Sequence, residues 1–485
     1  MSTPSVPVDA VVVSGGEDRD NRLPAGTPAT ARQAPWPNSR LAYYSLIILI
    51  VSSTFAQVDV AIVPYLASSI KADLGLSDTD LGLLLGVSFG LFYTLVGVPI
   101  AWFIDRYSRR WILALGIITF SLGTALCGLA QSFAGLFMAR FVVGAGEAVG
   151  GPTAYSIIGD LFPRERLPRA SAILMLSSVI GPALGLAVSG FLMARFLHMS
   201  PLDTPIGTIR GWQLIFIIVG MPSVLLSLLV LLTLKDPVRR SIPNQIQGTA
   251  ATARPWPGPL VAIQDYGVAI RYMREHWSVF LPLFGALFIV SLSGGAMQWM
   301  PIFYERTYGW GPAQLAGLMG ASAMIAMPLG LLTGVITAER FAKTHDDAAM
   351  RVNVVGRLIG LPSVFAVLMP NPWLAFAVGA FGMFSLGFAM PSQNAAIQTV
   401  IPAEYRGKIT ALYLFIYSVL GVALSPLITA VFTDYVFHDE AQIRWAIFVP
   451  SALFVPASLL IVLLGVKPYG REVARLRSLE APKQA

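Results

Sequence analysis

Residues 138–169, MARFVVGAGEAVGGPTAYSIIGDLFPRERLPR, decide how this chain is understood. The stretch is apolar enough to cross a bilayer, yet it contains Arg140, Glu147 and, near its end, Asp160. At about 1.5 Å per helical residue, Arg140 and Asp160 lie roughly 30 Å apart, which is one hydrocarbon thickness. Arg140 and Glu147 are separated by about two turns, so both side chains are expected on one helix face.

Ionisable groups at such depth cost about 2.5–3.5 kcal/mol each on insertion scales, and they normally face a protein interior or a wet cavity. Two interpretations follow: a charged transport or proton site, or a structural pair of opposite charges that locks helices together. The same stretch is rich in glycine. We expect close approach of neighbouring helices at Gly144, Gly146, Gly150 and Gly151.

The composition indicates a protein that crosses the membrane many times. Of 485 residues, 55% are hydrophobic and 12% are charged, against about 25% charged in soluble proteins. The net charge of +7 therefore does not indicate affinity for nucleic acid. In a membrane protein, the distribution of this charge over the loops is more informative. The single cysteine, Cys127, lies in an apolar run, which excludes an internal disulfide and suggests no metal cluster.

Apolar segments of spanning length recur twelve times, in two groups of six. The predicted spans are 42–69, 81–103, 111–130, 134–161, 170–195, 212–234, 278–303, 313–337, 352–370, 373–400, 408–433 and 444–466. We predict an all-α membrane protein whose twelve transmembrane helices form two six-helix bundles. The predicted parts are a disordered N-tail (1–39), an N-terminal bundle (40–234), a linker (235–277), a C-terminal bundle (278–467) and a C-tail (468–485).

The loop charges predict the orientation. With both termini in the cytoplasm, 26 of the 33 Lys and Arg residues fall in cytoplasmic segments and five in outer loops. The short outer loops fit a multi-pass protein of a bacterial inner membrane. Within the linker, GVAIRYMREH (267–276) is expected to form a short amphipathic helix at the membrane surface.

The two halves of the chain carry a weak internal repeat. LFPRERLPRASAI (161–173) after the fourth span matches VIPAEYRGKITAL (400–412) after the tenth. Two related six-helix halves indicate alternating access, with a substrate site between them near the midplane.

The loop after the second span resembles a motif of the major facilitator superfamily. It reads Asp105, Arg106, Tyr107, Ser108, Arg109, Arg110, and Ala101 stands where that superfamily has a glycine. The resemblance implies a cytoplasmic gate, in which Asp105 pairs with basic groups and helix termini of the neighbouring bundle, and Arg106, Arg109 and Arg110 occupy the basic positions. The alternative is an ordinary basic loop on the cytoplasmic side.

The opening stretch is similar to the Spinster-like branch of the superfamily, the sphingolipid and lysophospholipid transporters and their bacterial relatives. That resemblance implies a proton-linked carrier in which Arg140, Glu147 and an acid of the first span form the coupling centre. Asp59 is the candidate acid, and its position along the first span places it at a depth between Arg140 and Glu147. Val60 follows it where the family has arginine.

These residue types suit both proton transfer and anion binding. A carboxylate beside an arginine can load or release a proton when water or substrate changes its surroundings. An arginine stays charged and can bind an anionic group with two hydrogen bonds. Proton loading at Asp59 or Glu147 and anion binding at Arg140 then compete; the alternative is a permanent ion pair.

The C-terminal half has few charges within its spans. Its candidate cavity-lining groups, which equally suit helix packing, are Gln298, Trp299, Tyr304, Gln393, Asn394 and Gln398. An apolar C-half facing a charged N-half suits an amphipathic solute.

Other function classes lack their motifs. The sequence has no phosphate-binding Gly-Lys-Ser/Thr loop, no His/Cys cluster for a metal and no nucleophile elbow, so we predict no enzyme and no cofactor. We predict a secondary active, proton-coupled transporter for an amphipathic or anionic, lysolipid-like solute. The family resemblance implies that it works in the bilayer as a monomer. The alternatives are a drug or organic-anion carrier of unrelated substrate, and a membrane sensor that does not transport.

Overall fold

The structure is a computed structural model, and it describes residues 36–163, 165–205, 207–239 and 259–480. Most of the predicted N-tail, the middle of the linker and the last five residues lie outside the described residues. From Pro37 onward the chain forms one unit, which is the subject of all that follows.

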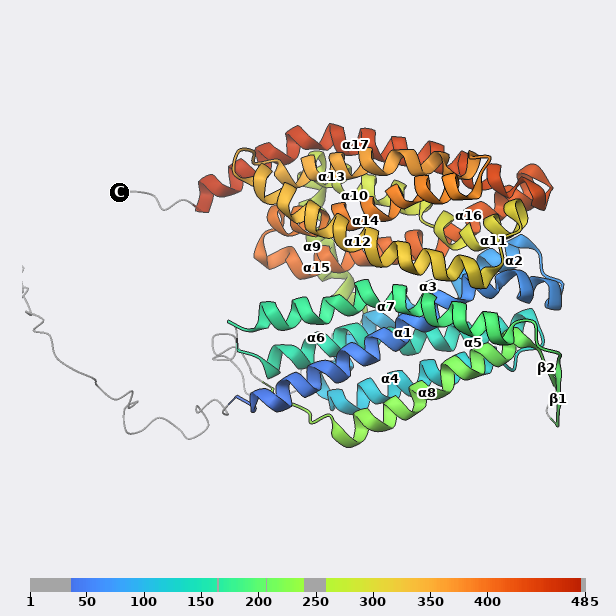
Figure 1. Cartoon of the computed structure of the whole chain (residues 1–485). Coiled ribbons are helices and arrows are strands. Elements are labelled where there is room, and N and C mark those ends of the chain that lie inside the picture. Colours follow the sequence, from blue (N-terminus) through green and yellow to red (C-terminus); the bar gives the residue numbers. More distant parts are fainter. Residues whose placement is uncertain (1–35, 164, 206, 240–258, 481–485) are drawn as a thin grey trace, which may run out of the picture. The chain divides into compact units, whose positions relative to one another are not determined.

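Twelve helical segments long and apolar enough to cross a membrane are present in the described chain, so the predicted fold is confirmed (Figure 1). The first six spans are α1 (Ser39–Leu74), α2 to α3 (Asp78–Gly82, Leu83–Val87 and Ser88–Arg106), α4 (Arg109–Cys127), α5 and α6 (Phe133–Glu147 and Gly150–Leu161), α7 (Leu167–Phe196) and α8 (Gly211–Thr233). The last six are α10 and α11 (Trp277–Ser293 and Ala296–Tyr308), α12 (Pro312–Ala342), α13 with η4 (Ala348–Gly360 and Leu361–Leu368), α14 (Pro372–Val400), α15 to η6 (Ala403–Ile416, Tyr417–Leu424, Ser425–Val431 and Phe432–Phe437) and η7 with α17 (Glu440–Gln442 and Ile443–Glu480).

Two short elements complete the described chain, and the last helix is longer than predicted. Helix α9 (Pro259–Glu275) covers nearly all of the linker segment expected to be helical. An antiparallel hairpin of strands β1 (Leu202–Thr204) and β2 (Gly207–Ile209) lies between α7 and α8. This hairpin was not predicted from the sequence. Helix α17 continues through the segment assigned to a tail, because Arg475 pairs with Glu472 one turn earlier and Arg477 pairs with Asp346.

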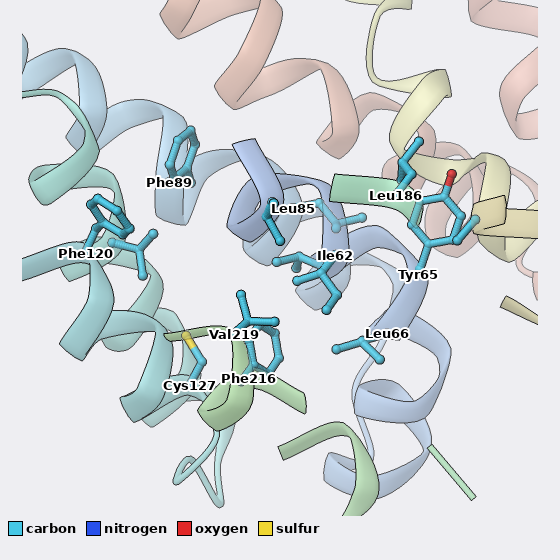
Figure 2. Packing of buried hydrophobic residues seen from close by; sticks show 14 of the residues in the cluster. Ile62, Tyr65, Leu66, Leu85, Phe89, Phe120, Cys127, Leu186, Phe216 and Val219 are labelled. Carbon is cyan, nitrogen blue, oxygen red and sulfur yellow. The ribbon is translucent and has the colours of Figure 1, made fainter. Parts of the chain in front are cut away.

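Aliphatic and aromatic side chains fill the interior of the N-terminal half (Figure 2). Ile62, Leu66 and Phe216 are fully buried there. By contrast, large apolar side chains on the outward faces of the spans stay exposed, as in Leu232 and Leu464 at 74% each. Exposed leucines over so much of the surface fit a protein whose surrounding solvent is lipid.

Two of the four glycines expected to admit a neighbouring helix do so. A Cβ atom on Gly144 would lie 2.6 Å from the carbonyl oxygen of Phe89, and one on Gly146 would lie 2.4 Å from the backbone nitrogen of Phe120. The expectation was wrong for Gly150 and Gly151, which have no heavy atom of a neighbouring element within 4 Å of that position. These two glycines begin α6, after the break between α5 and α6, and they face open space rather than a packed helix.

We therefore expect Gly146→Ala to destabilise the protein by about 1–3 kcal/mol, because the added methyl group overpacks the contact with α4. The thermal midpoint of the purified protein in detergent should fall. Gly150→Ala is the matched control and should leave the midpoint unchanged or raise it, since alanine favours the helix. Equal losses in both variants would contradict the packing account.

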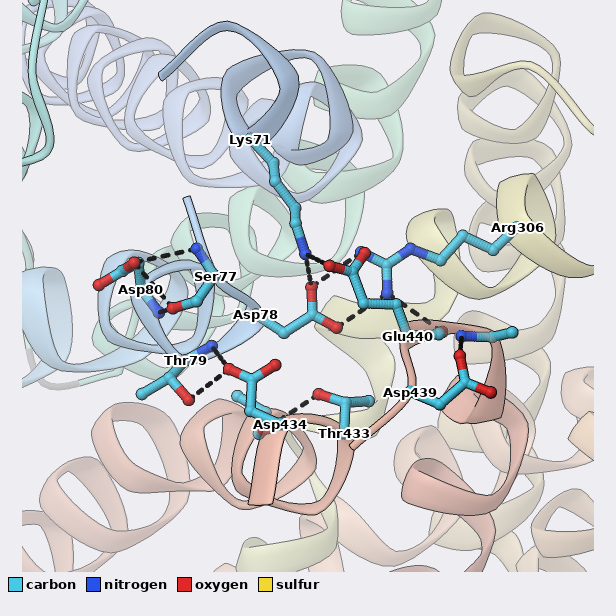
Figure 3. A network of polar contacts seen from close by, with 12 residues as sticks. Lys71, Ser77, Asp78, Thr79, Asp80, Arg306, Thr433, Asp434, Asp439 and Glu440 are labelled. Atoms are coloured by element: carbon cyan, nitrogen blue, oxygen red, sulfur yellow. Dashed lines mark hydrogen bonds and ion pairs between the residues drawn. The ribbon is translucent and has the colours of Figure 1, made fainter. Parts of the chain in front are cut away.

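The two halves meet through α7 against α12 and through α2 against α16 (Ser425–Val431). Some of their close approaches lie toward the end of the bundle that holds the start of α2 and the β1–β2 hairpin, where Gly190 packs on Ala313 and Gly82 packs on Ala430. At this same end a network of charged and polar side chains crosses between the halves (Figure 3). The two halves are thus closed against each other there.

Asp78, at the start of α2, is the centre of this network and is fully buried. Arg306 on α11 donates from Nη1 to Asp78 Oδ2 and from Nη2 to Asp78 Oδ1, both at 2.8 Å. Lys71 of α1 also pairs with Asp78 Oδ1, and both cations reach Glu440. A bidentate arginine–carboxylate pair in a buried setting joins the first half of the chain to the second.

We expect Asp78→Asn to lower the thermal midpoint in detergent. The change leaves Arg306 and Lys71 without their buried counter-charge, which typically costs about 3–5 kcal/mol. It should also open the end of the bundle that the network closes.

Thiol labelling measures that opening. Ala67, which is buried on α1 one turn before Lys71, is changed to cysteine in a Cys127→Ala background, and its labelling rate in detergent should rise when Asp78→Asn is added. Asp203→Asn, on the exposed hairpin, serves as the control. An unchanged labelling rate would show that Asp78 does not hold this end closed.

Candidate functional site

Three elements of the N-terminal half bring polar side chains together in its apolar interior. Helix α1 carries Asp59, α4 carries Thr124, and α5 carries Arg140 and Glu147. Asp59, Thr124 and Arg140 are all at most 3% exposed. The structure thus places the three charged residues singled out in the sequence in one cluster.

Both carboxylate oxygens of Asp59 are occupied. The Thr124 hydroxyl donates to Asp59 Oδ1 at 2.6 Å, and Arg140 Nη1 donates to Asp59 Oδ2 at 3.2 Å. Thr124 was not among the residues predicted from the sequence. A threonine in an apolar span usually bonds its own helix backbone, and nothing in its spacing indicated a partner on α1.

Arg140 has hydrogen-bonding capacity left over. Its guanidinium lies 5.3 Å from the centre of the Phe89 ring, a cation–π contact. Its Nε atom is buried and has no hydrogen-bond partner among the described residues. Arg140 also lines a small apolar pocket, together with Val63, Ala67, Ile70, Leu81, Leu84, Leu85, Leu136 and Phe216.

Glu147 lies on the same face of α5 as Arg140. Its carboxyl group is close enough to interact with Asp59, Arg140 and Tyr93. Its Oε1 atom is buried without a hydrogen-bond partner in the described part of the chain. Two carboxyl groups can share a hydrogen bond only when one of them carries a proton, so this contact suits a group that is protonated in part of a cycle.

In the described residues, the basic loop after the second span does not show the pairing of Asp105 that the resemblance implies. Arg109, 2% exposed, pairs with Asp160 at the end of α6 and with Asp236 after α8, with Nε 3.2 Å from Asp236 Oδ1. Asp105 is exposed, and no hydrogen bond of its carboxylate is found within the described ranges. Arg109 therefore fastens helices of its own half, and a gate formed by Asp105 stays a prediction.

The other two basic residues of that loop lie beside α3 and α4. The Arg106 guanidinium lies 4.1 Å from the centre of the Trp102 ring. Arg110 is half-buried, and its Nε atom has no partner in the described chain. Neither arrangement tests a role in gating.

The candidate cavity residues of the C-terminal half have mixed environments. Trp299 and Tyr304 lie in the packed core; Trp299 donates to the Pro426 carbonyl at 2.9 Å, and Tyr304 stacks on Trp310. Gln298 and Gln393 are half-buried, whereas Asn394 and Gln398 are exposed. A cavity role for all six stays a prediction.

The described residues contain no group of three or more His, Cys, Asp or Glu side chains that could hold a metal ion. The cluster at Asp59 is therefore an ion pair with a second carboxyl group beside it. It can hold or exchange a proton, and its arginine can bind an anion.

Comparison with known proteins gives this geometry a context. The sequence profile of the Major Facilitator Superfamily matches residues 48–426. The chain belongs to this superfamily. It is a membrane transporter by family and fold, and not an enzyme.

The individual relatives include Spinster proteins and other carriers. An MFS-type efflux pump of Mycolicibacterium smegmatis is 27% identical over 82% of this chain and 86% of the pump. Protein spinster homolog 1 of Xenopus tropicalis is 25% identical over 82% of this chain and 74% of its own. A crystal structure of a bacterial homologue of the human lysosomal transporter Spinster, inward-facing and unoccupied, matches with a TM-score of 0.70 at 23% identity, covering 91% of this chain and 99% of that one. The resemblance to Spinster-like proteins is confirmed.

Proposed function

We propose that this transporter is proton-coupled and carries an amphipathic or anionic organic solute, lysolipid-like in character, by alternating access. The observation that carries the proposal is the buried cluster of Asp59, Arg140 and Glu147, in which two polar atoms have no partner among the described residues. Unfilled polar atoms inside an apolar bundle are costly unless another species occupies them during function.

The contacts favour a division of roles within the cluster. Asp59 is held by Thr124 and Arg140 and acts as the fixed counter-charge. Glu147 has an unfilled oxygen and a second carboxyl group beside it, and it carries the proton. Arg140 has a free Nε–H and receives the anionic group of the solute. Binding of the anion weakens the hold of Arg140 on both carboxyl groups, which couples solute to proton.

The amphipathic character of the solute is supported by the apolar side chains around Arg140, which line a cavity much smaller than the solute itself. A cation at the edge of an apolar pocket suits a molecule with an anionic head and an apolar tail. A drug or organic-anion carrier is the alternative, and the efflux pump among the relatives favours keeping it. A permanent, merely structural ion pair at Asp59 is the competing account of the cluster.

We also propose that the protein lies in a bacterial inner membrane as a monomer with both termini in the cytoplasm. The surplus of Lys and Arg in the segments assigned to the cytoplasm supports this orientation.

Proteoliposomes with an imposed pH gradient test the proposal. With one proton per solute and a gradient of one pH unit, wild-type protein should drive about tenfold accumulation or depletion of its solute. Glu147→Gln cannot release a proton, so its gradient-driven transport should vanish. Exchange of solute at equal pH on both sides should survive in this variant, because exchange needs no net proton movement.

The assay uses lysophosphatidylglycerol and benzoate as representative amphipathic and organic-acid solutes. Glu339→Gln, an exposed position on α12, is the matched control and should behave as wild type. Asp59→Asn should lose both gradient-driven transport and exchange, since Arg140 loses its counter-charge. Gradient-dependent transport by Glu147→Gln at the wild-type level would refute the assignment of the proton to Glu147.

A further inference from the structure

Three arginines that are buried or half-buried within the described chain are matched by carboxylates. Arg109 pairs with Asp160 and Asp236, Arg140 with Asp59, and Arg306 with Asp78 and Glu440. Arg357, in the middle of the ninth span, is different. No carboxylate within the described ranges forms an ion pair with its guanidinium.

The contacts of Arg357 satisfy only part of its guanidinium. Nη1 donates to the Ser458 hydroxyl oxygen at 2.9 Å, and Nη2 reaches the Ala286 carbonyl oxygen at 3.5 Å, a weak bond at best. Nε is buried and has no partner in the described chain. Since arginine stays protonated, a full positive charge is held inside the C-terminal bundle without compensation.

The neighbouring side chains also offer hydrogen atoms rather than lone pairs. Tyr413, which interacts electrostatically with Arg357, accepts a hydrogen bond from Gln393 Nε2 at 3.2 Å, so its own hydroxyl hydrogen is left to donate. Ser458 donates to the Val455 carbonyl and accepts from Arg357. Donors therefore outnumber acceptors around the guanidinium, and the missing component is an acceptor, best supplied by an anion.

Tyr413 also connects the surroundings of Arg357 to α14. Tyr413 is 8% exposed, and its partner Gln393 is half-buried on α14, next to the exposed Asn394. The hydrogen bond between Gln393 and Tyr413 thus links a polar side chain of α14 to the neighbourhood of Arg357.

We propose that Arg357, with Tyr413 beside it, binds an anionic group, a carboxylate or a phosphate, of the transported solute in the C-terminal half. The identity of the ligand as solute rests on the proposed function, whereas the existence of an anion site does not. Together with Arg140 it gives each half of the transporter one cation for the solute.

The test is ligand binding to the full-length protein in detergent, without a proton gradient, so that it can succeed or fail independently of proton coupling. The probes are inorganic phosphate and lysophosphatidylglycerol, titrated at constant ionic strength, with the thermal midpoint and the intrinsic fluorescence as readouts. Wild-type protein should be stabilised by at least one probe. Arg357→Gln should raise the dissociation constant for that probe roughly tenfold or more, because a charge-assisted hydrogen bond is lost.

Arg351→Gln is the matched control, since Arg351 lies on the same helix, is exposed and pairs with Asp347 at 2.6 Å. Its affinity for the probe should equal that of wild type. Tyr413→Phe keeps the aromatic ring and removes the hydroxyl, and it should weaken binding by a smaller factor. This variant keeps the test valid if Arg357→Gln does not fold.

The outcomes separate the possibilities. Binding of lysophosphatidylglycerol that depends on Arg357 supports a site for the anionic head of an amphipathic solute. Binding of phosphate alone, again dependent on Arg357, supports an anion site that takes a small free anion and overturns the amphipathic assignment. No stabilisation of wild type by either probe, or equal affinities in wild type and Arg357→Gln, overturns the site. A lower midpoint of ligand-free Arg357→Gln with unchanged affinity would show that Arg357 only holds helices together.

Discussion

The cost of an uncompensated charge in an apolar bundle organises this transporter. Each half must keep its ionic groups away from lipid, and the structure does this by pairing them inside. The pair of Arg140 with Asp59 joins α5 to α1, and that of Arg109 with Asp160 joins α4 to α6. The pair of Arg306 with Asp78 joins the two halves. The same pairs that satisfy the charges therefore also fix which helices lie side by side.

Where pairing is incomplete at the charged residues of the spans, we propose that function is the reason. Glu147 and Arg140 each keep a buried polar atom without a partner in the described chain, and Arg357 keeps one as well. A purely structural arrangement would gain by satisfying or removing such atoms. A transporter, however, must hold binding capacity in reserve for its solute. The contact at Asp78 holds the two halves against each other near the start of α2.

Much of the site was predictable because membrane sequences have a strong depth signal. A helix rises by a fixed length per residue, so positions along two spans convert directly into relative depth, and Asp59 could be placed beside Arg140 and Glu147 before any contact was known. The rotation of each helix about its own axis was much harder to predict from the sequence. The contacts of Thr124, Gly150 and Arg109 depend on how each helix is rotated and where it is interrupted. Sequence periodicity does not show this in a segment that is apolar on all sides.

The sequence by itself determined the twelve spans, the two related halves and the few ionic residues within the membrane, because hydrophobic length and charge are properties of short segments. Only the tertiary structure decided which ionic residues meet. It paired Arg109 with Asp160 and Asp236, buried Asp78 between Lys71 and Arg306, and left Arg357 without a carboxylate partner in the described chain. Such pairings depend on contacts between helices distant in sequence, and no local pattern records them.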